Sequence, residues 1–287
     1  MASVLALVSS VLWGLGDFVG GLASRRARPL QVLLVSMPVG LLLVTPIALL
    51  VGGDARGSFG PGVGAGVFGT VGLLCLYGAL ATGPMGVLAP VSAVLAAAIP
   101  VVVGLVSGER PGPLAYVGMA LAVVAIVTVG LEPSAPTDDD QHQRVTPRAL
   151  LLAIGAGLGF GLFFTVVSAA PDDAGLWPAV WARALSSVLV AVIALVLYLR
   201  TGARPLETSR ATLGLSAVAG CLDASANGLY VVAVQTGLLS VVSVLGSLYP
   251  AATVLLARFV LGERLRPLQR VGMLTALAAS VLLAVGS

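Results

Sequence analysis

The sequence predicts an all-α integral membrane protein, with ten transmembrane helices arranged as two inverted five-helix repeats. Of the 287 residues, 58% are hydrophobic and only 9% are charged, whereas a soluble domain is about 25% charged. The chain also contains a long internal repeat, and its arginines are distributed unequally between the loops of the two halves. So few charges cannot cover a water-facing surface, and a lipid bilayer is therefore the expected solvent.

The individual helices follow from windows of about 20 mostly apolar residues, the length needed to cross the hydrocarbon core. The first window has no basic segment before it and its positive cluster comes after it, so we expect a retained helix and not a cleaved signal peptide. Short Thr-Gly joints separate the third window from the fourth and the eighth from the ninth. In order, the predicted spans are 3–23, 30–51, 61–81, 85–106, 113–131, 148–170, 176–199, 211–235, 238–261 and 267–286.

The internal repeat becomes visible when the sequence is shifted by 154 positions, and it needs no gap from about residue 65 to residue 127. Each copy holds five predicted spans, an odd number, so the second copy must enter the membrane from the opposite face. Inverted-topology repeats of this kind occur in many secondary transporters. We therefore expect a first five-helix repeat at 1–131, a polar linker at 132–147 and a second repeat at 148–287.

The repeat is most obvious at two Gly-Glu-Arg corners, one in each half. Glycine tolerates the conformation that ends a helix, and proline is accepted at the first position of the next helix. We interpret these corners as structural turns at the membrane surface and not as substrate contacts. Their charged residues are Glu109, Arg110, Glu263 and Arg264.

The arginines support the inversion independently. All 15 basic residues are arginines, and the predicted topology places twelve of them on one face and only Arg56 and Arg110 on the other. The positive-inside rule makes the arginine-rich face cytoplasmic, which places both termini outside. The twelve are Arg25, Arg26, Arg28, Arg144, Arg148, Arg200, Arg204, Arg210, Arg258, Arg264, Arg266 and Arg270.

The Trp13-Gly14 pair, the two Gly-Glu-Arg-x-x-Pro-Leu corners and the duplicated five-helix unit resemble the drug/metabolite transporter superfamily, and more closely its ten-helix EamA-type members. The resemblance covers the whole chain and implies a transporter. This sequence departs from the pattern at Ser36, which stands where the second half has Arg183. Members of this type are also drawn with both termini in the cytoplasm, opposite to the arginine count, so the orientation stays open.

Three ionisable side chains fall inside predicted spans, where such groups usually face a cavity or a partner. They are Asp17, Arg183 and Asp223, and the depth of Asp223 along its helix makes it better placed than Asp17 to meet Arg183. One carboxylate is then left without a fixed countercharge, which makes it a candidate proton carrier. The alternative is structural: Arg183 and Asp223 pair only to hold two helices together.

Further polar and aromatic residues share faces with these three, because residues three or four apart lie on one side of a helix. We expect them to line one cavity for a solute or a proton. They are Trp13, Asn227, Tyr230 and, beside a helix-kinking proline, Tyr249.

These features predict a secondary active transporter, an exporter of a small metabolite or drug-like solute, that works by alternating access. Coupling to protons through Asp17 or Asp223, exchange of solutes and uniport all stay open. Arg183 could hold a carboxylate such as that of an amino acid, whereas Asp17 and Trp13 could hold a cation. The alternatives are a non-transporting membrane scaffold and an intramembrane lipid-modifying enzyme. We expect a plasma-membrane location, no enzyme activity, no cofactor or metal and no nucleic-acid partner; a homodimer stays open.

Overall fold

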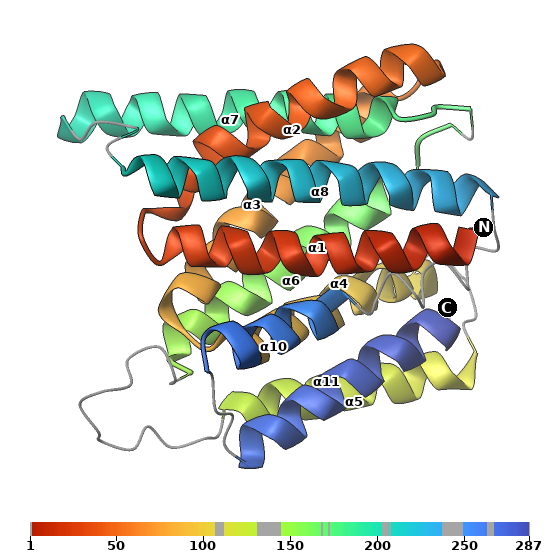
Figure 1. The fold of residues 1–287 in the computed structure, drawn as a ribbon. Coiled ribbons are helices and arrows are strands. Elements are labelled where there is room, and N and C mark those ends of the chain that lie inside the picture. Colours follow the sequence, from red (N-terminus) through yellow and green to blue (C-terminus); the bar gives the residue numbers. More distant parts are fainter. Residues whose placement is uncertain are drawn as a thin grey trace.

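The computed structural model describes residues 2–106, 112–130, 145–167, 169–171, 173–202, 206, 208–236, 249–262 and 267–286. These residues form helices and connecting turns, with no strand among them, which confirms the predicted all-helical fold (Figure 1). The helices are α1 (Ala2–Ser24), α2 (Pro29–Val51), α3 (Phe59–Thr82), α4 (Met85–Val106), α5 (Pro113–Gly130), α6 (Pro147–Val167), α7 (Trp177–Thr201), α8 (Arg210–Thr236), α10 (Tyr249–Val260) and α11 (Pro267–Gly286).

The helix ends agree with the predicted ones to within three residues, apart from the start of α10. The predicted sixth span ends earlier than expected, at Val167, and it begins at Pro147, the residue assigned to the end of the linker. Several predictions lie outside the described residues: most of the linker, the first part of the span 238–261, and the corner residues Glu109, Arg110, Glu263 and Arg264.

Six of the described helices are long and apolar enough to cross a membrane: α1, α2, α3, α6, α7 and α8. Shorter apolar stretches occupy Met85–Ala96 in α4, Tyr249–Val260 in α10 and Arg270–Ala279 in α11. Large apolar side chains on the outer faces are strongly exposed, including Leu50 (87%) and Leu199 (73%). Apolar surface on this scale is suited to lipid and not to water.

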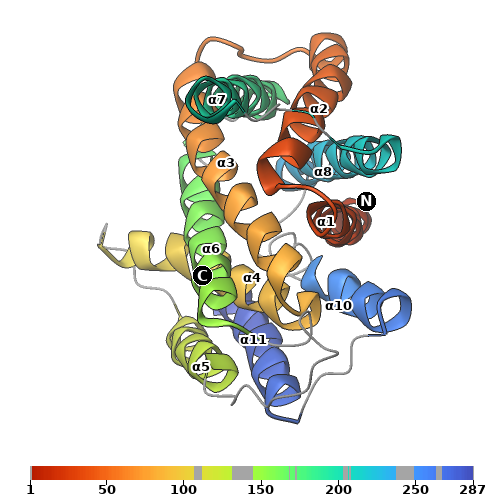
Figure 2. The same ribbon diagram turned by 90° about the vertical axis from the view of Figure 1, so that its left-hand side faces the viewer.

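The helices pack in layers (Figures 1 and 2). Helices α2 and α7 lie on one side of the bundle, α1, α3, α6 and α8 occupy its middle, and α5 pairs with α11 on the opposite side. The closest packing joins α3 with α6, α1 with α8 and α5 with α11. The main apolar core lies where α3 meets α4, around the fully buried side chains of Leu76, Tyr77, Leu80, Met85 and Leu88.

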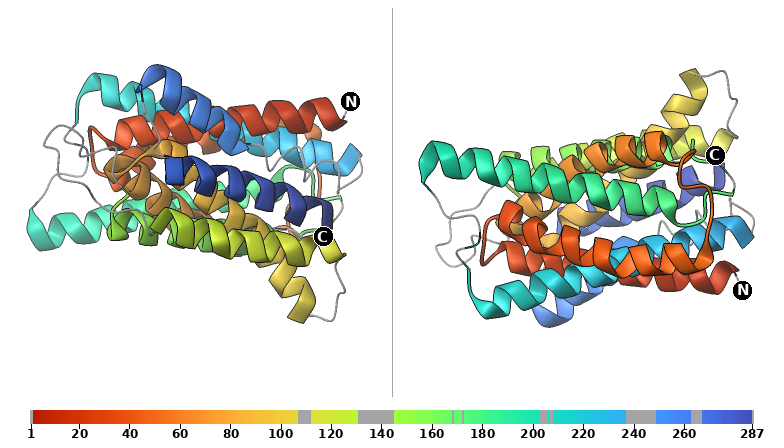
Figure 3. Two further views of the ribbon diagram at one scale, coloured as in Figure 1. Left: turned by 90° about the horizontal axis from the view of Figure 1, so that it is seen from below. Right: turned by 90° about the horizontal axis from the view of Figure 1, so that it is seen from above.

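Both termini lie at the same end of the bundle (Figures 1 and 3). The other end holds the junction of α1 with α2, the start of α6, the end of α7 and the start of α8. Arginines stand at each of these places: Arg25, Arg26 and Arg28, then Arg148, Arg200 and Arg210. The described arginines of these loops therefore gather at one end of the molecule.

Glycines allow the central helices to approach closely, which is how helices commonly pack inside membranes. A Cβ atom placed on Gly159 of α6 would lie 2.7 Å from Cα and 2.8 Å from the backbone nitrogen of Gly72 in α3. A Cβ atom on Gly228 of α8 would meet nothing within 4 Å. The added Cβ of Gly159 would clash with backbone atoms, which cannot easily move. Gly159 should therefore tolerate a larger side chain less well than Gly228 does.

We expect Gly159→Ala to destabilise the protein by about 1–3 kcal/mol, the usual cost of overpacking. Gly228→Ala is the matched control, and it should be neutral or stabilising because it adds helix propensity without a clash. Thermal unfolding of both variants in mild detergent measures the difference. Equal midpoints would show that the α3–α6 contact is not a rigid constraint.

Candidate functional site

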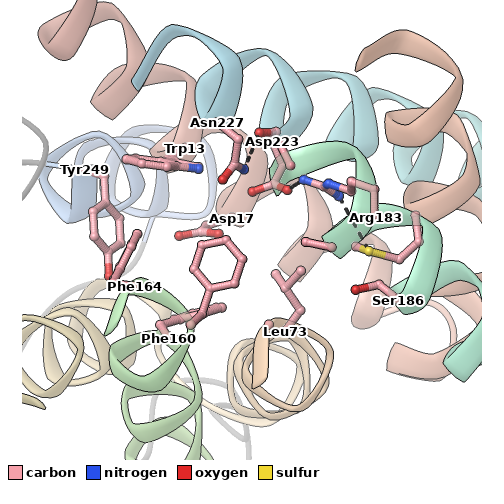
Figure 4. Close-up of a pocket in the computed structure, with 15 residues that line it drawn as sticks. Trp13, Asp17, Leu73, Phe160, Phe164, Arg183, Ser186, Asp223, Asn227 and Tyr249 are labelled. Carbon is pink, nitrogen blue, oxygen red and sulfur yellow. Dashed lines mark hydrogen bonds and ion pairs between the residues drawn. The ribbon is translucent and has the colours of Figure 1, made fainter. Parts of the chain in front are cut away.

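A cavity of about 80 Å³ lies inside the bundle, between helices from both halves of the chain (Figure 4). Seven helices contribute to its walls. The lining residues are Trp13 and Asp17 of α1, Met37 of α2, Gly69 and Leu73 of α3, Phe160, Phe163 and Phe164 of α6, Ala179, Ala182, Arg183 and Ser186 of α7, Asp223 and Asn227 of α8, and Tyr249 of α10.

An ion pair between Arg183 of α7 and Asp223 of α8 forms one side of the cavity (Figure 4). The two side chains are only 8% and 16% exposed. Arg183 also donates a hydrogen bond to the sulfur of Met37 at 3.5 Å, and the Asn227 amide donates to the backbone carbonyl of Asp223 at 2.7 Å. The positive charge of Arg183 is therefore already matched within the protein.

Asp17 is 8% exposed and reaches the cavity from α1. Among the residues that the structure describes, its carboxylate has neither an ion-pair partner nor a hydrogen-bond partner. Tyr77 of α3 and Tyr249 of α10 are close enough to interact with it electrostatically, and neither carries a positive charge. An isolated buried charge is costly, so this carboxylate is positioned to attract a proton or a cation.

An aromatic cluster adjoins Asp17, centred on Trp13 one helical turn before it. The ring centroid of Trp13 lies 5.2 Å from that of Tyr230, and 6.2 Å from those of Phe164 and Tyr249. The Trp13 contacts with Phe164 and Tyr249 are edge-to-face, a preferred arrangement of aromatic pairs. The side chain of Ser92 in α4 lies close to the phenol of Tyr249.

The structure brings most of the predicted site residues to one cavity. Tyr230 is the exception, because it packs on Trp13 and does not line the wall. Arg183 pairs with Asp223, in agreement with the depths of these residues along their helices. Contact of any of these residues with a solute stays a prediction. The predicted residues that lie on the cavity wall are Trp13, Asp17, Arg183, Asp223, Asn227 and Tyr249.

Sequence reasoning missed the phenylalanines of α6. Phe160, Phe163 and Phe164 all line the cavity, and their spacing of three and four residues places them on one helical face. That spacing was the available signal. The preceding glycine run masked it, since the glycines indicate a packing helix, and Gly159 does pack directly on α3.

The fold and the cavity together define a helical, multi-pass membrane protein with a buried polar site. Two segments of the chain, residues 1–131 and 147–285, match the EamA-like transporter family, and the chain belongs to this family, within the drug/metabolite transporter superfamily. The site therefore belongs to a member of a transporter family.

The fold is similar to that of a solved structure described only as "Crystal structure of protein". The similarity covers 98% of this chain and 95% of that chain, with a TM-score of 0.60 and 16% sequence identity. At this identity the similarity shows the fold alone. No curated protein matches the sequence.

Proposed function

We propose that this protein is a secondary active transporter that exports a small metabolite or drug-like solute across the plasma membrane by alternating access. In this proposal, ten transmembrane helices form two inverted repeats, residues 1–131 and 148–287, which the segment 132–147 links. The observation that carries the proposal is the buried cavity between the two halves, with the carboxylate of Asp17 unmatched by any described cation. The protein acts on its solute as a monomer or as a homodimer.

The helix contacts support the inverted repeat because they occur in pairs related by exchange of the halves. The α3–α6 contact has its counterpart in α8–α1, and α2–α8 has its counterpart in α7–α3. The glycines at these crossings agree: a Cβ on Gly66 would meet the carbonyl of Ala182, and a Cβ on Gly220 would meet the carbonyl of Ser36. Gly66 and Gly220 are 154 positions apart, the shift of the sequence repeat.

Hydrogen bonds join the two halves at the end of the bundle that carries the termini. The Asp54 backbone N–H donates to the carbonyl of Asp173 at 3.0 Å, and the Trp181 indole N–H donates to the carbonyl of Ala55 at 2.8 Å. The cavity volume is also smaller than the roughly 300–1,000 Å³ of drug-sized ligand sites. Alternating access would break these contacts and widen the cavity towards that end.

The alternative functions have less support. A membrane scaffold needs neither a cavity nor an unmatched buried carboxylate. A lipid-modifying enzyme would need acids or histidines clustered near a membrane surface. The two carboxylates and the guanidinium described in this cavity instead lie deep in the bundle, where Arg183 and Asp223 neutralise each other.

Flux in proteoliposomes tests the proposal. Purified protein should catalyse saturable uptake from a panel of radiolabelled organic cations and amino acids, and unlabelled solute on the opposite side should accelerate that uptake. Such acceleration is a property of an alternating-access carrier and not of a channel. Uptake no faster than in protein-free liposomes, for every solute on the panel, would contradict a transport function for these solutes and favour the scaffold.

A further inference from the structure

The charges of the cavity carry an inference that deepens the proposed function and rests on it. Among the described residues, the ionisable groups of its wall are Asp17, Arg183, Asp223 and the phenol of Tyr249. With Arg183 and Asp223 paired, the carboxylate of Asp17 leaves the site with one unmatched negative charge whenever it is ionised. A solute that neutralises this charge must itself be positive.

An anionic group has no comparable place in the cavity. To reach Arg183, a solute carboxylate would have to displace Asp223 and leave two bare carboxylates in the site. Two of the neutral donors are used within the protein: the Asn227 amide donates to the carbonyl of Asp223, and the Ser186 hydroxyl donates to the carbonyl of Gly66 at 3.1 Å. These donors of the wall are thus occupied within the protein.

The walls next to Asp17 are aromatic. Five rings line the cavity, those of Trp13, Phe160, Phe163, Phe164 and Tyr249. Figure 4 shows Asp17 beside Trp13 and Phe160, whereas Arg183 lies beside Asp223. Ring faces attract alkylammonium groups, by about 0.5–2 kcal/mol for each well-placed ring.

We propose that the transported solute is a small organic monocation, held with its charge at Asp17 and its alkyl groups against the Trp13 ring cluster. The cavity volume of about 80 Å³ favours a compact cation over a large polycyclic one. A quaternary ammonium such as choline satisfies each condition: one positive charge, no need for donors from the protein, and an apolar surface for the rings.

Equilibrium binding to the purified protein tests this inference without requiring transport. The probe is radiolabelled choline, with 3,3-dimethylbutan-1-ol as the neutral competitor of the same shape and glutamate as the anionic competitor. Choline should bind, and the neutral competitor should be at least about tenfold weaker, because a difference of 1.4 kcal/mol changes affinity tenfold. Glutamate should not compete.

The variants separate charge from ring contacts. Asp17→Asn keeps the shape of the side chain and should weaken choline binding about tenfold or more, and Trp13→Leu about fivefold. The matched controls are Asp173→Asn in the exposed α6–α7 turn and Phe259→Leu, whose side chain is 80% exposed on α10. Both controls should bind choline like the unaltered protein. A single symmetric peak in gel filtration verifies that each variant is folded.

Three outcomes would overturn the inference: no choline binding by folded protein, equal binding by Asp17→Asn, or glutamate binding that depends on Arg183. Choline binding without choline flux would leave the cation-binding site standing and contradict transport of choline. Flux of an anionic solute by a protein that does not bind choline would support the transport function and overturn the inference of a cationic solute. The two proposals can therefore fail separately.

Discussion

Asp17→Asn is expected to abolish solute flux driven by an imposed pH gradient. Asparagine fills the same space as aspartate but cannot exchange a proton at physiological pH. Asp17 is the carboxylate of the cavity that no described residue matches, whereas Asp223 is held by Arg183. If the carboxylate of Asp17 carries protons across, the variant should show only the flux of protein-free liposomes under the gradient.

The control is Asp173→Asn, which makes the same chemical change at an exposed position outside the cavity. Only the backbone carbonyl of Asp173 takes part in the contact with Asp54, so this variant should retain full flux. A second variant, Asp17→Glu, keeps an acid at the site and should retain the response to the gradient at a reduced rate. Undiminished gradient-driven flux in Asp17→Asn would remove Asp17 from the coupling mechanism and direct attention to Asp223.

Arg183→Gln is expected to cost about 3–5 kcal/mol of stability, the usual effect of removing one partner of a buried ion pair. The cost arises because Asp223 keeps its charge in a site where its side chain is only 16% exposed. The double variant Arg183→Gln with Asp223→Asn removes both charges and should cost much less. Unfolding of the protein in mild detergent, with rising denaturant or temperature, provides the measurement.

The four proteins of this double-mutant cycle isolate the coupling between the two residues. A double variant clearly more stable than Arg183→Gln alone would confirm that the ion pair holds α7 to α8. Additive losses would instead mean that the two charges act independently, and that their contact contributes no stability. A purely structural pair would leave solute selectivity unchanged once both charges are removed.

Much of the fold could be predicted because the membrane limits the choices. Apolar windows of sufficient length placed α1 to α8 and α11 close to their observed ends, since every backbone group in lipid must be satisfied within a helix. Glycine and proline marked several boundaries, for example Pro113 at the start of α5 and Pro267 at the start of α11. The packing of the helices against one another could be predicted less well, because an apolar surface suits lipid and a neighbouring helix equally well.

Part of the candidate site could likewise be predicted from the sequence, and part could not. The sequence alone determined that Asp17, Arg183 and Asp223 lie within apolar spans, where an ionisable side chain needs a cavity or a partner. Helical spacing also connected Trp13 with Asp17, and Asn227 with Asp223. These conclusions depend on positions within a single helix, which the order of residues fixes.

Only the tertiary structure decided that Arg183 pairs with Asp223 and that Asp17 is left without a partner among the described residues. It also decided which side chains surround Asp17. The Arg183–Asp223 pair forms across α7 and α8, and the rings beside Asp17 come from α1, α6 and α10. Contacts between helices depend on rotation, depth and crossing angle, and no spacing within one helix specifies these. The phenylalanines of α6 become cavity walls only because Gly159 brings that helix onto the backbone of α3.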